Sequence, residues 1–152
     1  MRTSSKKPFH LAFVAMLAAA IQSSVYAQSL LCAMDSAAGI AFDKVTKEWK
    51  STTFSPKGKF VVSKSANPNA KWEVKSLGSS NETAFCKDDF SSNGQLTCTG
   101  FFQDFYINRK SLRFIHTYYA GYWNEESASK LFPNRTEGND TPMVAAGTCA
   151  PI

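Results

Sequence analysis

The chain has 152 residues, of which 43% are hydrophobic, and its formal net charge at pH 7 is +5. This length suits one domain and hardly two. Three of the 17 basic residues but none of the 12 acidic ones lie within residues 1–27, so the charge of the remaining chain is +2, which is too small for a nucleic-acid-binding surface.

Residues 1–27 have the three parts of a secretory signal peptide. A positively charged start is followed by the apolar run 11–21 and by a short polar stretch that ends in Ala27. The apolar run is too short to span a bilayer, which takes about 20 helical residues. We expect cleavage after Ala27, a mature chain that begins at Gln28, and export to the periplasm or the medium. No later segment is apolar enough to predict a membrane span.

Residues 28–152 show the pattern of short strands separated by turns. Residues 71–75 alternate apolar and charged side chains, as a half-buried strand does. Residues 101–107 and 112–119 flank a polar segment and are typical of a hairpin. The segments that we expect to be strands are 40–42, 45–54, 60–62, 71–75, 83–87, 95–99, 101–107, 112–119 and 143–149.

Two segments leave the prediction open. Residues 40–42 and 45–54 indicate an opening hairpin, although residues 43–50 would also suit a short helix. Residues 124–142 are polar and show no period, which predicts a long surface loop or a loop with one helical turn.

All four cysteines follow the signal segment, at Cys32, Cys86, Cys98 and Cys149. An even number in a small exported domain predicts disulfides, with three possible pairings. We favour Cys86–Cys98, because a turn-rich insert lies between them, and Cys32–Cys149, because this pair joins the two ends. Leu31 argues against lipidation of Cys32, since a lipoprotein site has a small residue there. Zinc is disfavoured, because there is no CxxC pair, and no cofactor is expected.

The fold class predicted from these segments is all-β. About eight short strands in close succession favour one antiparallel β-barrel or sandwich, disulfide-bonded and preceded by a signal peptide. The barrel is favoured because a Cys32–Cys149 bond would bring the first and last strands together.

Catalytic signatures are weak in this sequence. His116 is the single histidine after the signal segment, no GxSxG motif is present, and disulfides would occupy every thiol. Glu73 alternates with Trp72 and Val74, so we expect it to face away from the core. The segment that starts at Asp89 resembles the beginning of a calcium loop, but Gly100 stands where a glutamate is needed, which favours an Asx-rich turn.

Aromatic residues are the strongest indication of a site. The chain has 12 Phe, 5 Tyr and 3 Trp, and all but three of these lie after residue 27. Neighbouring aromatics on a strand point to opposite faces, so both cannot enter one core. We therefore expect a binding surface at the end of one strand, although a second small core under the following loop is an alternative. The expected binding residues are Tyr118, Tyr119, Tyr122 and Trp123, together with Arg113 on the same strand.

The sequence thus predicts an exported, non-enzymatic binding or inhibitor-like domain whose partner is a protein or glycan of the cell envelope or outside the cell. In signal peptide, size and number of cysteines the chain is similar to the small disulfide-bonded barrels that bacteria export as lysozyme inhibitors. No functional residue is transferred from that likeness. The alternatives are a small exported hydrolase that uses carboxylates or His116, and a structural protein of the envelope.

Overall fold

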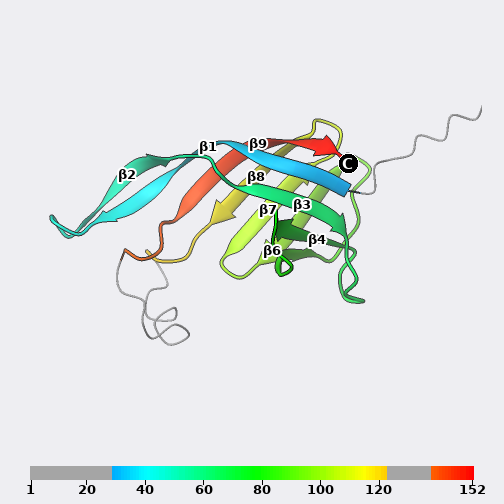
Figure 1. Ribbon diagram of the computed structural model, residues 1–152, viewed down its shortest axis with the longest axis horizontal. Coiled ribbons are helices and arrows are strands. Elements are labelled where there is room, and N and C mark those ends of the chain that lie inside the picture. Colours follow the sequence, from blue (N-terminus) through cyan, green and yellow to red (C-terminus); the bar gives the residue numbers. More distant parts are fainter. Residues whose placement is uncertain (1–28, 123–137) are drawn as a thin grey trace, which may run out of the picture.

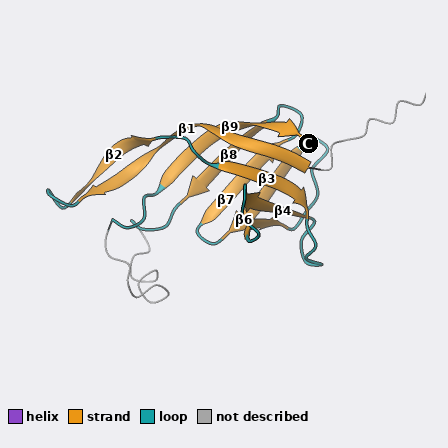
Figure 2. Cartoon of the chain, in the orientation of Figure 1, coloured by secondary structure: helices purple, strands orange, loops and turns teal. Residues whose placement is uncertain are grey.

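The computed structural model describes residues 29–122 and 138–152, and the regular secondary structure in these ranges consists of nine β-strands (Figure 1, Figure 2). All strand pairs are antiparallel. The strands are β1 (Ser29–Asp43), β2 (Glu48–Phe54), β3 (Lys59–Lys64), β4 (Trp72–Ser76), β5 (Glu82–Cys86), β6 (Gln95–Gly100), β7 (Gln103–Asn108), β8 (Arg113–Tyr118) and β9 (Met143–Pro151).

Eight of these strands close into a barrel. Strands β3 to β9 follow one another in chain order, and β1 pairs with both β3 and β9 to complete the ring. The first part of β1 pairs with β3, and its second part pairs with β2, so the β1–β2 hairpin extends past the barrel (Figure 1). An irregularity between Met34 and Ser36 interrupts the β1–β9 ladder, just after the part of β1 that pairs with β3 has ended. The predicted all-β fold is confirmed, as a barrel rather than a sandwich.

The core fills the inside of the barrel because every second side chain of each strand points inward. Val62 and Val74 are fully buried, and Phe60 meets Phe105 edge-on with ring centroids 4.9 Å apart. Burying side chains of this size contributes about 1.5–3 kcal/mol each. The remaining inward residues include Leu30, Trp72, Ala84, Leu96, Ile107, Phe114 and Ala145.

Both predicted disulfides are confirmed, and both lie inside the barrel. Cys32 and Cys149 face each other directly in the β1–β9 ladder, so this bond crosses the strand pair that closes the ring. Cys86 and Cys98 join β5 to β6 across the loop between them. In the chain-entropy account, each bond stabilises the folded state by about 3–5 kcal/mol.

The opening hairpin is confirmed, although its strands begin at Ser29 and Glu48 instead of residues 40 and 45. Residues 43–50 do not form a helix, because the Asp43 carboxylate and carbonyl accept turn hydrogen bonds from Val45 and Lys47. Phe101 and Phe102 form the β6–β7 turn instead of starting β7, since Phe102 has a left-handed backbone with φ of 59°. Residues 123–137, which make up most of the predicted loop 124–142, lie outside the described residues.

Candidate functional site

The structure separates the residues that the sequence predicts to bind a partner. The Tyr118 hydroxyl donates a hydrogen bond to the Asp140 carboxylate at 2.8 Å, and the side chain is half-buried. Tyr119 is also half-buried and meets Phe102 edge-on at 6.3 Å, and burial raises the pKa of its hydroxyl. Arg113 lies at the opposite end of β8 from Tyr118.

Tyr122 is the one predicted binding residue in the described ranges that is both aromatic and largely exposed, at 61%. Its ring meets Trp49 of the projecting hairpin edge-on, with centroids 5.4 Å apart. Trp49 in turn packs against Phe42 at 5.5 Å. Trp123 lies outside the described residues, so a binding surface at residues 118–123 stays a prediction.

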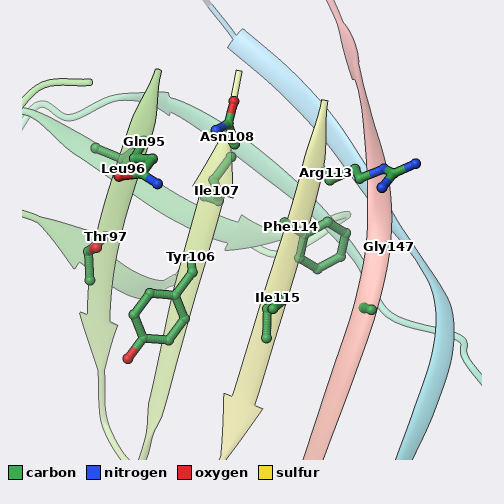
Figure 3. A pocket seen from close by; sticks show the side chains of 11 residues that line it. Gln95, Leu96, Thr97, Tyr106, Ile107, Asn108, Arg113, Phe114, Ile115 and Gly147 are labelled. Atoms are coloured by element: carbon green, nitrogen blue, oxygen red, sulfur yellow. The ribbon is translucent and has the colours of Figure 1, made fainter. Parts of the chain in front are cut away.

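A different surface, on the outer wall of β6 to β9, brings exposed aromatic, aliphatic and polar side chains together (Figure 3). Tyr106 on β7 and Ile115 on β8 are direct cross-strand partners, and they are 48% and 46% exposed. The same row continues to Thr97 on β6 and to Ala146 on β9. We call the hollow over this row the wall groove; its volume is about 500 Å³.

Polar residues border the wall groove toward one end of the barrel. Gln95 on β6, Asn108 on β7 and Arg113 on β8 form the next row of outward side chains. Asn108 is held in place because its carboxamide oxygen accepts hydrogen bonds from the backbone of Lys110 and Ser111. The groove therefore combines an apolar row with a polar border.

A second hollow lies over β5 and β6 and has a volume of about 530 Å³. Phe85, 36% exposed, lies on its β5 side, and Thr97 also belongs to the wall groove. We call this hollow the β5 pocket. Its polar residues are Asn67, Asn69, Lys87, Asp88, Thr97 and Thr99.

Sequence reasoning missed both hollows, although the cysteines gave a usable signal. Both disulfides join neighbouring strands on the inner face of the barrel, so residues next to a cysteine on the same strand must point outward. Phe85 precedes Cys86, and Thr97 precedes Cys98. Tyr106 follows the same logic, because it lies between the buried Phe105 and Ile107.

His116, which the hydrolase alternative would use, is buried in the barrel core, with 4% of its surface exposed. Its Nε2 atom forms a hydrogen bond with the carboxamide oxygen of Gln103 at 3.0 Å. Burial lowers the pKa of His116 to about 4. The partner of Nε2 is an amide, and no carboxylate among the described residues is hydrogen-bonded to this imidazole to orient it as a catalytic base.

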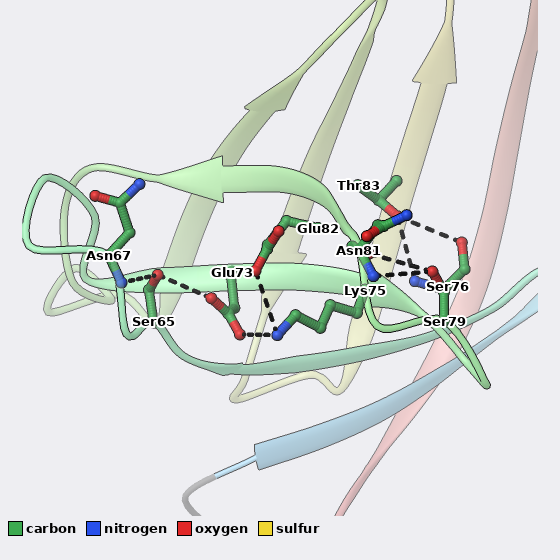
Figure 4. Close-up of polar contacts among 9 residues, drawn as sticks. All are labelled: Ser65, Asn67, Glu73, Lys75, Ser76, Ser79, Asn81, Glu82 and Thr83. Carbon is green, nitrogen blue, oxygen red and sulfur yellow. Dashed lines mark hydrogen bonds and ion pairs between the residues drawn. The ribbon is translucent and has the colours of Figure 1, made fainter.

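Glu73 is on the outer face, as predicted, yet it is buried within an ion-pair network (Figure 4). Lys75 Nζ lies 2.7 Å from Glu73 Oε1 and 3.5 Å from Glu82 Oε1, and Ser65 donates a hydrogen bond to Glu73 Oε2. Burial raises the pKa of Glu73, but the hydrogen bonds from Lys75 and Ser65 outweigh it, so the net shift is downward. This carboxylate is held ionised and joins strands β4 and β5 to the loop after β3.

The segment after Asp89 forms a loop without a metal site among the described residues. Asp89 Oδ1 accepts a hydrogen bond from the indole nitrogen of Trp72 at 2.8 Å, and Oδ2 pairs with Lys64 at 3.0 Å. In the ranges that the structure describes, no group of three or more His, Cys, Asp or Glu side chains is placed to hold a metal ion.

The described residues contain no helix that is long and apolar enough to cross a membrane. The chain matches no protein-family model, no curated protein and no solved structure. The candidate site therefore rests on the geometry of this chain itself, and it consists of the wall groove with the adjoining β5 pocket.

Proposed function

We propose that the protein is an exported, non-enzymatic binding domain that recognises a protein or glycan partner through the wall groove. The observation that carries this proposal is the pair of Tyr106 and Ile115, which lie side by side and nearly half exposed in a hollow of about 500 Å³. An exposed apolar patch with a polar border marks an interaction site on a soluble protein.

The nature of the side chains supports this use of the groove. Tyrosine and arginine are enriched among the residues that dominate binding energy, and Tyr106 and Arg113 both line the groove. Strands β7 and β8, which carry Tyr106 and Ile115, are each paired on both sides along their length, so their backbone groups already have partners within the sheet. A ligand must therefore be recognised by side chains, which are what the groove offers.

Two observations favour binding over the hydrolase alternative. His116 is buried against Phe105 and bonded to an amide, and Glu73 is ionised within an ion pair. A general acid or base needs access to substrate and a pKa near the working pH. Neither group combines these properties.

Export is supported by two features of the chain. Residues 1–27 have the composition of a secretory signal peptide. The two disulfides fit an oxidising compartment, such as the periplasm or the extracellular medium.

The proposal is tested by affinity capture from envelope and extracellular fractions with the purified exported protein. The double variant Tyr106→Ala/Ile115→Asp disrupts the groove, and Leu77→Asp is the matched control, since Leu77 is 54% exposed and lies outside the groove. We expect the groove variant to lose a specific partner that the wild type and the control retain, with melting temperatures unchanged. Equal capture by all three proteins would contradict the proposal.

A further inference from the structure

We infer that the wall groove and the β5 pocket form one continuous track for a neutral, linear oligosaccharide. This inference rests on the proposed function and deepens it by naming the chemical class of the ligand. The two hollows adjoin, because Thr97 of β6 lines both. We call the combined surface the wall track.

Each hollow contributes one exposed aromatic ring to the wall track. Phe85 projects from β5 and Tyr106 from β7, with β6 between them. Phe85 and Tyr106 are two strands apart across the sheet and are offset by two residues along it. This arrangement places their Cα atoms about 12 Å apart. Figure 3 looks onto the face of the Tyr106 ring, which lies along the outer wall. An aromatic face carries partial negative charge and attracts the C–H groups of a sugar ring. The separation suits a short oligosaccharide better than a single sugar.

The polar groups along the wall track match sugar hydroxyls, which both donate and accept hydrogen bonds. Carboxamides and hydroxyls have the same double capacity. Asn67 is oriented by the hydrogen bond that its oxygen accepts from the Asn69 backbone at 2.9 Å, as Asn108 is by its own turn. The polar side chains of this kind are Asn67, Asn69, Gln95, Thr97, Thr99 and Asn108.

The wall track carries few charged side chains, and they are of both signs, which favours a neutral ligand over an anionic polymer. Lys87 is followed directly by Asp88. Among the described residues, Arg113 is the one further charged side chain that lines the track. A polyanion site would instead show cations without interspersed carboxylates.

The closed wall also disfavours an extended peptide. Peptides that bind a sheet in extended form add a strand at a free edge and use main-chain hydrogen bonds. Phe85 is paired with Glu73 on one side and Thr99 on the other, and Tyr106 is paired with Thr97 and Ile115. No free strand edge is therefore offered beside either ring, and recognition there must come from rings, amides and hydroxyls.

Isothermal titration calorimetry of the exported protein with cellohexaose, chitohexaose and maltohexaose tests the inference. We expect saturable binding of at least one of them, weakened about tenfold by Phe85→Ala and by Tyr106→Ala, each of which removes one ring contact. Phe101→Ala is the matched control, because Phe101 is 56% exposed on the β6–β7 turn and outside both hollows. This control should bind like the wild type.

Three outcomes would overturn the inference: no binding of any of the hexasaccharides, binding that neither ring variant weakens, or binding that depends on Tyr106 alone. The capture experiment with the groove variant separates this failure from failure of the proposed function. If a protein partner is lost with Tyr106→Ala/Ile115→Asp while no hexasaccharide binds, the groove functions in binding and the ligand class is wrong. If both experiments are negative, both proposals fall.

Discussion

The imidazole of His116 lies flat against the phenyl ring of Phe105, with ring centroids 4.3 Å apart and 10° between the ring planes. Phe60 meets the same imidazole edge-on at 5.4 Å, and Gln103 is hydrogen-bonded to its Nε2 atom. The buried Nδ1 atom has no hydrogen-bond partner within the described residues. A proton added to Nδ1 would therefore put an unpaired charge in the barrel core.

This environment makes stability depend on pH in a defined window. Burial lowers the pKa of His116 from 6.5 to about 4, so the unfolded chain binds the proton more tightly than the folded one. The contribution of the neutral imidazole is complete above pH 6.5 and is lost as the pH falls toward 4. We expect the free energy of unfolding, measured with urea, to decrease by about 2 kcal/mol across this window.

His116→Gln is the control for this pH dependence, because it keeps a hydrogen-bonding group beside Gln103 and cannot titrate. Glu73 and Asp89 also have lowered pKa values, but their contributions are lost only below their ordinary values of 4.5 and 3.8. The variant should lack the decrease between pH 6.5 and about 5, which lies above the range in which these carboxylates titrate. An equal decrease in variant and wild type would assign the effect to other groups.

Removing the Asp89 carboxylate should destabilise the end of the barrel near Trp72. Asp89→Ala leaves the indole nitrogen of the buried Trp72 without its acceptor, which costs about 1–3 kcal/mol. It also removes the partner of Lys64, whose ammonium group lies 4.2 Å from the centre of the Trp72 ring. Thermal unfolding of Asp88→Ala, which removes the neighbouring carboxylate, should match the wild type. Equal melting temperatures for both variants would contradict this role.

The two disulfides should differ in their contribution to stability. Cys32–Cys149 closes a sequence separation of 117 residues and Cys86–Cys98 one of 12, so the chain-entropy model predicts losses of about 5 and 3 kcal/mol on removal. The double variants Cys32→Ala/Cys149→Ala and Cys86→Ala/Cys98→Ala are matched, since each removes two buried sulfur atoms. Urea unfolding should rank the first variant as the less stable. The reverse order would show that native-state packing outweighs loop closure.

Gly147 is required by the packing between β9, β1 and β8. A Cβ atom at this position would collide with the carbonyl oxygen of Ala33 and with the ring of Phe114. We expect Gly147→Ala to lower the free energy of unfolding by about 1–3 kcal/mol, as overpacking of a core does. Ala146→Ser, at the adjacent outward position, should change it by less than about 0.5 kcal/mol. Similar values for the two variants would show that the barrel absorbs the extra methyl group.

Regular alternation and cysteine placement made much of the fold predictable. Residues 71–75 alternate so clearly that β4 follows from the sequence, and the turn between Cys86 and Cys98 indicates their pairing. The first two thirds of β1 were not predicted, because alanine, serine and glycine have weak strand preference. That segment becomes a strand through its pairing with β3 and β9, which is a long-range effect.

The candidate site was harder to predict than the fold. Tyr118 and Tyr119 were expected to split between core and surface, but Tyr119 follows the end of β8, where alternation no longer applies, and both side chains are half-buried. Tyr106 and Ile115 come from separate strands, and only the β7–β8 register makes them neighbours. A single sequence does not reveal register across a closed barrel.

Closure of the barrel leaves β2 as the one strand of the described ranges with a single neighbour. An unpaired strand edge is a template for strand addition between chains, which leads to aggregation. Glu48 and Lys50 place charges on β2, and Lys50 pairs with Asp43 at 2.7 Å. These charges oppose uncontrolled association at high protein concentration. Resistance to aggregation thus depends on one short hairpin instead of the whole sheet.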